Sequence, residues 1–399
     1  MNVRLLQEAT RLFQANRIAE AGGLYEQVLN ENPRDFVALS GLGYVRIHEA
    51  RWEEAARLLV AAAAVEPRDF NVWYHLSSAL YRMGRPPDSL NALERGLGLD
   101  PGHVEGLTNR AALLLELGRP NEALVTSETA LAFRPDFAFA HVNRGNALAA
   151  LKRHEEAVAA YDAVLAIEPG HASARENREN ALFELRRLSR CPPGFMRRLF
   201  DGYSALYDSH MVGTLKYRAH VHLRTLFDRL FPDAMPPMRI LDLGSGTGLV
   251  GEEFKDLAKG ARLDGIDLAP LMIEEAKKRG IYDDLILGDL ETVLSGQGPA
   301  YDLALAADTM IYIGDLAPAF SGVANRLAPG GHYLFAVEAK EGEGWEQTDT
   351  NRFRHSLAYM RGEAERAGLE FLDRMECTLR EEGNGPIAGF AVALRKPVS

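Results

Sequence analysis

The stretch Gly-Ser-Gly-Thr-Gly at positions 244–248 has the residue types and spacing of a loop that holds a ligand by its backbone. Ile240 to Leu243 precede it and predict a short buried strand, and the run from Leu249 to about Leu257 predicts a helix. Glycine adopts positive φ without a Cβ clash and lets a ligand approach closely. The first turn of a helix offers free N–H groups to such a ligand. These elements predict a nucleotide-type pocket at the carboxyl edge of a parallel sheet.

The residue after the last glycine distinguishes between nucleotide ligands. A dinucleotide fingerprint has glycine or alanine at position 249, where this chain has Leu249. With Leu241 before it, the stretch instead resembles the first motif of class I S-adenosylmethionine-dependent methyltransferases. The resemblance implies that S-adenosyl-L-methionine is the cofactor and that the motif residues contact it, namely Asp242, Gly244, Ser245, Gly246 and Gly248.

A second strand, Arg262 to Ile266, ends in Asp267, which stands 23 residues after Gly244. The two oxygens of a carboxylate match the two hydroxyls of a ribose, so Asp267 is the expected ribose ligand. A third strand ends before Gly288. By the same resemblance, the adenine is contacted by residues that follow these two strands, Leu268, Asp289 and Leu290.

Candidate catalytic residues follow the fourth and fifth predicted strands. If the acceptor is a hydroxyl or a protonated amine, a general base assists the transfer, and Asp308 and His355 are the candidates. Tyr312 and Tyr359 are candidates to orient the acceptor. A hydrogen-bonded structural role for His355 remains an open alternative. The loop after the fourth strand has no Pro-Cys nucleophile, which excludes cytosine C5 chemistry.

The segment before the sheet begins with Cys191-Pro-Pro-Gly194, which stops any helix and marks a domain boundary. Tyr203 and Tyr207 follow in a pattern that resembles the helices covering the cofactor in many small-molecule methyltransferases. At helical spacing they are equally compatible with core packing. The expected domains are 1–190, a linker with lid helices at 191–237, and the catalytic domain at 238–399. The polar stretch 342–351 reads as a loop and a candidate substrate lid.

Proline recurs every 34 residues in the first half of the chain, at positions 33, 67, 101, 135 and 169. This period is the signature of tetratricopeptide repeats, which are stacked pairs of antiparallel helices. Small residues recur at the same phase, among them Ala9, Gly43 and Gly145, where two helices approach closely. We expect five repeats, closed by a capping helix from His171 to Arg190.

The resemblance to this repeat family implies a concave surface that binds a protein or peptide. Its expected lining is polar and aromatic: Tyr44, Tyr74, Tyr81, Asn109, Asn143 and Asn146. A role in forming a homodimer, or as a spacer, has equal weight.

Composition fits a soluble globular protein, with 47% hydrophobic and 25% charged residues. The net charge of −11 argues against a nucleic-acid duplex as the main partner. Two cysteines and the lack of an apolar signal region suggest the reducing cytoplasm, without a membrane span. No His/Cys/Asp cluster has metal-ligand spacing, so we expect no metal.

The expected fold is an all-α tetratricopeptide-repeat solenoid followed by an α/β doubly wound, Rossmann-like, seven-stranded methyltransferase domain. The expected function is S-adenosylmethionine-dependent methyl transfer, with repeats that recruit a protein or carrier-bound acceptor. Two alternatives stay open. One is a small-molecule methyltransferase whose repeats oligomerise or localise it, and the other is a non-catalytic scaffold that binds the cofactor.

Overall fold

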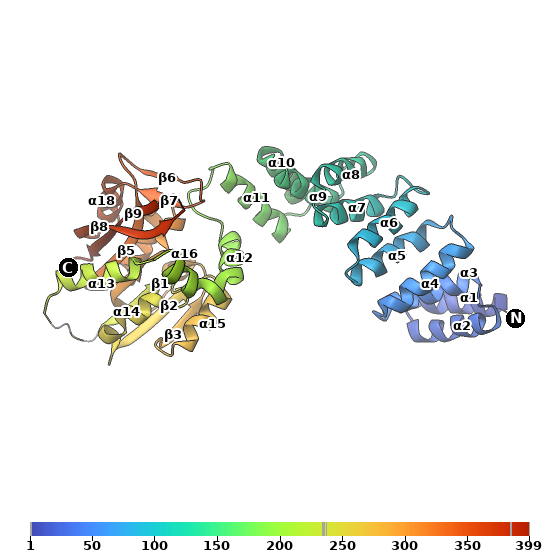
Figure 1. Cartoon of the computed structure of the whole chain (residues 1–399), viewed down its shortest axis with the longest axis horizontal. Coiled ribbons are helices and arrows are strands. Elements are labelled where there is room, and N and C mark those ends of the chain that lie inside the picture. Colours follow the sequence, from blue (N-terminus) through green and yellow to red (C-terminus); the bar gives the residue numbers. More distant parts are fainter. Residues whose placement is uncertain (1, 234–235, 237, 384, 399) are drawn as a thin grey trace. The chain divides into compact units, whose positions relative to one another are not determined.

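A computed structural model describes residues 2–233, 236, 238–383 and 385–398 of the chain. The chain divides into two compact units, Met1–Leu185 and Arg186–Ser399. Every element in the described part of the first unit is a helix, whereas the second unit is built on a β-sheet (Figure 1). The division lies five residues before the expected boundary at 190. The expected linker end at 237 and chain end at 399 lie outside the described residues.

The first unit is a stack of antiparallel helix pairs, which confirms the predicted repeats. The pairs are α1 (Asn2–Gln14) with α2 (Ile18–Glu31), α3 (Phe36–His48) with α4 (Trp52–Val65), α5 (Phe70–Arg82) with α6 (Pro86–Leu97), α7 (Val104–Glu116) with α8 (Pro120–Phe133), and α9 (Ala138–Ala150) with α10 (His154–Ile167). A further helix, α11 (Ala172–Glu184), follows them.

The boundaries of these helices have local causes. In four repeats, the residue two positions after the repeat proline caps the next helix. Its side chain accepts a hydrogen bond from a backbone N–H in the first turn of that helix. These caps are Asp35, Asp69, His103 and His171. Gly84 and Gly118 follow α5 and α7 with φ of +70°, a left-handed conformation that glycine adopts at little cost. The repeated caps and turns therefore set the 34-residue period.

Small side chains allow the two helices of each pair to pack closely. A Cβ on Gly145 would lie 2.5 Å from Cε1 of Tyr161, and one on Gly43 would lie 2.8 Å from Cγ of Leu59. In the third pair a serine takes this place, and the Ser77 and Ser89 hydroxyls lie 2.9 Å apart. The recurrence of small residues in the sequence is thus a packing requirement.

The second unit has a twisted sheet whose central strands are parallel. They are β1 (Arg239–Leu243), β2 (Arg262–Asp267), β3 (Asp284–Leu287), β4 (Tyr301–Ala306) and β5 (Leu327–Ala339), joined by the antiparallel hairpin β8 (Glu370–Glu382) and β9 (Gly385–Arg395). The hydrogen-bonded order of these seven strands is β3-β2-β1-β4-β5-β9-β8. This order confirms the predicted doubly wound domain.

The stretch 342–351, expected to be a loop, contributes a short strand instead. Its β6 (Trp345–Gln347) pairs antiparallel with β7 (Phe353–His355), and β7 pairs with the end of β5. The ring centroids of Trp345 and Phe353 lie 5.4 Å apart in an edge-to-face contact. Cross-strand aromatic packing of this kind supports a short hairpin at the sheet edge despite its polar sequence.

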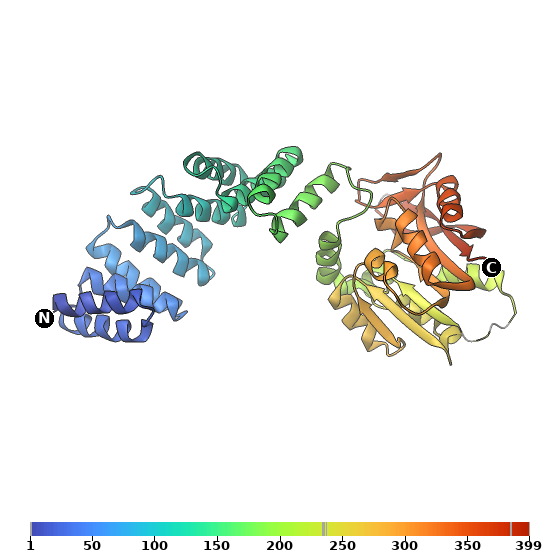
Figure 2. The ribbon, with the colours of Figure 1, turned by 180° about the vertical axis from the view of Figure 1, so that it is seen from behind.

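Helices cover both faces of the sheet, as Figures 1 and 2 show from opposite sides. They are α13 (Ala219–Leu230), α14 (Leu249–Ala258), α15 (Pro270–Lys278), α16 (Leu290–Ser295), α17 (Ala317–Arg326) and α18 (Leu357–Arg366). Successive β1 side chains enter opposite cores, with Ile240 in one apolar cluster and Leu241 in the other. Burial on both faces explains why adjacent β1 positions, Ile240 and Leu241, are both apolar.

A lid precedes the sheet. It consists of α12 (Pro193–Tyr203), the short turn η1 (Ser204–Leu206) and the π-helical turn η2 (Ser209–Thr214). Asp201 accepts a hydrogen bond of 3.0 Å from the Leu271 N–H at the start of α15, and Asp208 pairs with Arg279 at 2.5 Å. The lid is therefore attached to the carboxyl edge of the sheet. Within the described residues, the helices are too short or too polar to cross a bilayer.

Candidate active site

A cavity of about 120 Å³ lies at the carboxyl edge of the central strands, beneath the lid. Its walls come from residues 190–191 before the lid, the lid itself, the glycine loop, and the segments that follow β2, β3 and β4. They are Arg190, Cys191, Pro193, Met196, Phe200, Tyr207, Gly244, Gly246, Ile266, Asp267, Leu268, Met272, Gly288, Asp289, Leu290, Asp308, Thr309, Tyr312 and Ile313. Most of the residues expected from the sequence meet in this one cavity.

The glycine loop has the predicted strand–turn–helix form, and its geometry explains the glycines. Gly244 has φ of +73°, and a Cβ there would lie 2.1 Å from Oγ1 of Thr309. Thr309 is fixed because its hydroxyl donates a 2.7 Å hydrogen bond to the Leu243 carbonyl. Gly246, with φ of +52°, has open space where a Cβ would stand. Residue 244 is thus constrained by the protein, whereas Gly246 leaves its backbone open to the cavity.

Asp267 is held by two backbone donors. The Gly246 N–H donates to Oδ2 at 2.7 Å, and the Ala269 N–H donates to Oδ1 at 2.8 Å. Burial raises the pKa of the Asp267 carboxyl, and these backbone hydrogen bonds oppose that rise. Each oxygen keeps acceptor capacity for a ligand, because a carboxylate oxygen has two lone pairs.

Three expected loop contacts lie behind the cavity and do not line it: Asp242, Ser245 and Gly248. Asp242 is fully buried, and its Oδ2 accepts a 2.6 Å hydrogen bond from the Tyr282 hydroxyl. Burial raises the pKa of the Asp242 carboxyl to about 7. A Cβ on Gly248 would lie 2.8 Å from Cδ of Arg279. In this geometry these residues shape the loop from behind.

Leu268, Asp289 and Leu290 line the cavity, together with Met272. Asp289 caps α16, and its Oδ2 forms a 2.5 Å ion pair with Nη2 of Arg190. The same guanidinium reaches Glu291 at 2.6 Å. The carboxylate that the resemblance assigns to the adenine therefore has a protein partner in this structure.

Asp308 and two tyrosines, Tyr207 and Tyr312, also line the cavity. The Phe200 ring contacts both tyrosines edge-on, with centroid distances of 6.2 and 5.6 Å. Burial raises the pKa of the Asp308 carboxyl to about 6, while the neighbouring Arg380 opposes that rise. A carboxylate with such a pKa is ionised at neutral pH and suited to proton transfer.

A buried ionic network stands behind Asp308. Arg380 is fully buried, ion-pairs with Glu338, and its Nε lies 2.7 Å from Glu382. Its Nη1 is 3.5 Å from Oδ1 of Asp308, and Arg352 also pairs with Glu382. Neither Nη1 nor that Oδ1 has a hydrogen bond among the described residues. The network places fixed positive charge beside Asp308, which stabilises its ionised form.

His355 does not fit the expectation of a general base. It is fully buried outside the cavity, and its Nε2–H lies within hydrogen-bond distance of the carbonyls of Ile313 (2.8 Å) and Gly314 (3.1 Å). Burial lowers the pKa of its imidazole to about 4. This placement favours the structural role for His355 that the sequence left open. Tyr359 also lies outside the cavity, and its hydroxyl bonds Asp315 at 3.2 Å.

The sequence left two roles open for the lid tyrosines, covering the cofactor and packing in the core, and the two residues differ in which role they fit. Tyr207 lines the cavity, whereas Tyr203 lies behind it, hydrogen-bonded to His210 and 5.5 Å from the Tyr207 ring. The sequence did not predict that residues 190–191, just before the lid, contribute to the cavity wall. The Cys191 N–H donates to the Tyr312 carbonyl at 2.9 Å, and the Gly314 N–H donates to the Ser189 carbonyl at 2.7 Å. The Pro-Pro-Gly pattern indicated a boundary, but nothing in it marked a pocket wall.

Several side chains of the expected repeat groove form hydrogen bonds within the repeats. Asn109 donates to the Tyr74 hydroxyl at 3.1 Å, and Asn143 donates to the Thr108 carbonyl at 2.9 Å. Asn146 accepts from the Tyr161 hydroxyl at 2.9 Å, while Tyr81 remains 48% exposed.

No group of three or more potential metal-ligating side chains occurs among the residues that the structure describes.

Comparison with protein families and known proteins agrees with these two units. Tetratricopeptide-repeat models match residues 12–80, 74–136 and 138–171, and a methyltransferase-domain model matches residues 240–331. The repeats also align with the crystal structure of YrrB, described as a TPR protein with an unusual peptide-binding site. The TM-score is 0.42 at 23% identity, over 44% of this chain and 90% of that one.

Two curated relatives are O-methyltransferases. Malonyl-[acyl-carrier protein] O-methyltransferase of Serratia marcescens is 30% identical over 29% of this chain and 47% of its own length. Ubiquinone biosynthesis O-methyltransferase of Methylocella silvestris is 35% identical over 28% of this chain and 43% of its own. The chain thus spans less than half the length of these relatives. Residues 12–171 are therefore tetratricopeptide repeats, and residues 240–331 belong to the methyltransferase domain family.

Proposed function

We propose that the second unit transfers the methyl group of S-adenosyl-L-methionine to an acceptor that is a protein or is borne by one. The observation that carries the proposal is the Asp267 carboxylate, fixed by the Gly246 and Ala269 N–H groups in the cavity wall. A carboxylate held in this way is prepared for the paired hydroxyls of a ribose.

The residues around Asp267 suit the rest of this cofactor. Gly246 leaves open space where a Cβ would stand, so a ligand can approach the loop backbone. Leu268, Met272 and Leu290 supply an apolar surface for a planar base. S-adenosyl-L-methionine brings an already activated methyl group, so the protein supplies alignment and exclusion of water.

At the acceptor end, Asp308 is the proposed general base, and Tyr207 and Tyr312 position the acceptor. Asp308 lines the cavity with a side chain that is 11% exposed, and Arg380 lies 3.5 Å from its Oδ1. The nearby guanidinium favours the ionised carboxylate, which accepts the proton of a hydroxyl acceptor. The O-methyltransferase names of the relatives support an oxygen acceptor.

The proposed role of the repeats is to bring a protein-borne acceptor to this cavity. Repeats of this kind present extended surfaces to partners, and attachment to the catalytic unit raises the effective concentration of whatever they bind. One relative acts on a malonyl group held by an acyl-carrier protein, which is an acceptor of this kind. Deleting residues 1–171 should then raise KM for the acceptor and leave cofactor affinity unchanged. Equal kcat/KM values would favour a small-molecule acceptor.

Calorimetry with S-adenosylhomocysteine tests the cofactor assignment. Asp267→Ala should weaken binding by about 1–3 kcal/mol, because the ribose hydroxyls lose their charged partner. Asp284→Ala is the matched control: Asp284 begins β3 and pairs with Arg262 at 3.7 Å, outside the cavity. Equal affinity of the Asp267 variant and the wild type would refute the ribose assignment.

A further inference from the structure

An arginine-rich segment forms part of the cavity wall. Residues 186–198 contain five arginines and no Asp or Glu, in a chain whose net charge is −11. The arginines are Arg186, Arg187, Arg190, Arg197 and Arg198. Arg190 is half-buried and lines the cavity, and the other four are exposed. The strongest local excess of positive charge in the sequence of the second unit therefore lies beside the candidate active site.

The backbone of this segment is fixed to the cavity. Ser189 accepts hydrogen bonds from the N–H groups of Gly314 and Asp315, at 2.7 and 3.0 Å, and Cys191 donates to Tyr312. Pro193 and Met196, on the inner side of α12, line the cavity, while Arg197 and Arg198 on the same helix are exposed. A partner held by the exposed arginines would thus be held at the cavity edge.

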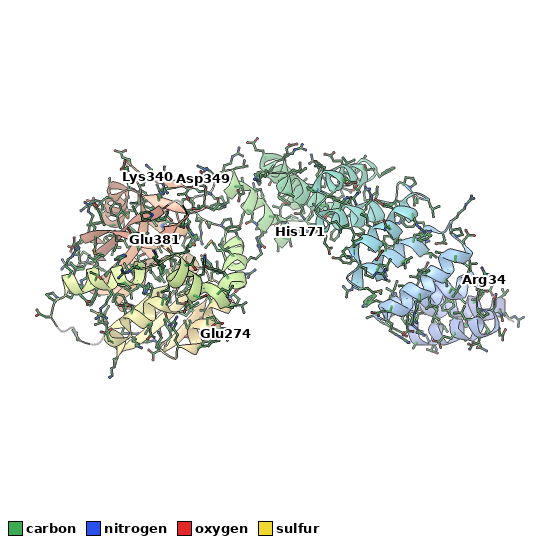
Figure 3. The ribbon with its side chains drawn as sticks, in the orientation of Figure 1. Arg34, His171, Glu274, Lys340, Asp349 and Glu381 are labelled. Carbon is green, nitrogen blue, oxygen red and sulfur yellow. The ribbon has the colours of Figure 1, made fainter. Side chains whose placement is uncertain are left out.

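The surroundings of the arginines have the features of a protein-binding surface. Leu199, next to Arg198, is 46% exposed, and Leu206 in η1 is 66% exposed. Arginines beside exposed apolar side chains are typical of interfaces. Arg186 pairs with Asp349, labelled in Figure 3, but the two side chains are 57% and 96% exposed. An ion pair so open to solvent is weak and leaves the guanidinium available to a partner.

We propose that residues 186–199 are the docking surface for an acidic protein that carries the methyl acceptor; this rests on the proposed function. The cavity, of about 120 Å³, admits the end of an acceptor group and not a folded protein. The carrier must therefore bind outside and extend the acceptor inward. An acidic face fits the arginines, and electrostatic attraction speeds such encounters. The exposed apolar side chains of Leu199 and Leu206 beside the arginines favour a protein partner over the phosphate backbone of a nucleic acid.

The test compares charge reversals in the full-length chain. Arg197→Glu/Arg198→Glu reverses two charges on α12, and Arg34→Glu/Arg68→Glu makes the same change at two exposed turns of the repeats (Arg34 is labelled in Figure 3). The probe is fluorescently labelled malonyl acyl-carrier protein, with binding followed by anisotropy at low and moderate salt. We expect the α12 pair to weaken binding about tenfold or more, the control pair to match the wild type, and added salt to weaken wild-type binding.

S-adenosylhomocysteine affinity, measured on every variant, separates the two proposals. Intact cofactor binding without carrier binding, or carrier binding that is insensitive to the α12 pair, would overturn the docking proposal and leave the proposed function standing. If the wild type does not bind S-adenosylhomocysteine, the proposed function itself is overturned. A single-stranded RNA oligonucleotide is the competing probe, and tighter arginine-dependent binding of the RNA than of the carrier would also overturn the docking proposal.

Discussion

Gly244→Ala should destabilise the second unit far more than an ordinary glycine replacement, because two effects add. The residue has φ of +73°, and a left-handed conformation costs an alanine about 1–2 kcal/mol. Its new Cβ would also lie 2.1 Å from Oγ1 of Thr309 and 3.0 Å from Cβ of Thr309. Relieving that contact displaces Thr309 from the Leu243 carbonyl and strains the packing, at about 1–3 kcal/mol. The expected loss is therefore about 2–5 kcal/mol.

Gly280→Ala is the matched control. Its φ of +63° requires the same left-handed conformation, but no atom lies within 4 Å of the position of a Cβ. It should cost about 1–2 kcal/mol. The difference between the two variants thus isolates the contact with Thr309.

Urea unfolding followed by tryptophan fluorescence measures this difference. The chain has three tryptophans, and replacing Trp52 and Trp73 by Phe leaves Trp345, in β6, as the sole reporter of the second unit. A single reporter avoids mixing the unfolding of two units. If Gly244→Ala and Gly280→Ala lose equal stability, the close contact between position 244 and Thr309 is absent. The conclusion that the protein itself requires glycine at position 244 would then be refuted.

Three further predictions concern pH, domain limits and repeat packing. Burial raises the folded-state pKa of Asp242 from 3.8 to about 7, so the folded state holds this proton more tightly than the unfolded state does. The free energy of unfolding should therefore fall as the pH rises from about 4 to 7. Asp242→Asn should remove this slope from the urea midpoint measured between pH 4 and 8. A fragment of residues 186–399 should bind S-adenosylhomocysteine like the full chain, and 195–399 should bind it more weakly in calorimetry, because the latter lacks the Arg190 and Cys191 wall. Gly145→Ala should lower the thermal midpoint of the repeats, because its Cβ would meet an aromatic ring at 2.5 Å, whereas Gly23→Ala, with open space, should raise it through helix propensity.

The sequence by itself determined the two architectures and the main cavity residues. A 34-residue period and its small residues specify stacked helix pairs, because each pair must repeat the same caps and close contacts. The strand–glycine–helix pattern and the later strand ends likewise predicted that Gly244, Gly246 and Asp267 meet at one sheet edge. Local patterns suffice here, because the carboxyl ends of parallel strands must lie together.

Only the tertiary structure decided which polar side chains face the cavity. Asp308 and His355 were equal candidates in sequence, yet one lines the cavity and the other is buried against the carbonyls of Ile313 and Gly314. The partner of Asp308, Arg380, stands 72 residues away on the returning hairpin. Arg190, in a stretch that reads as a linker, reaches Asp289 across 99 residues. Such pairings depend on strand order and on which buried charge needs a counter-charge, and neither leaves a periodic signal in the chain.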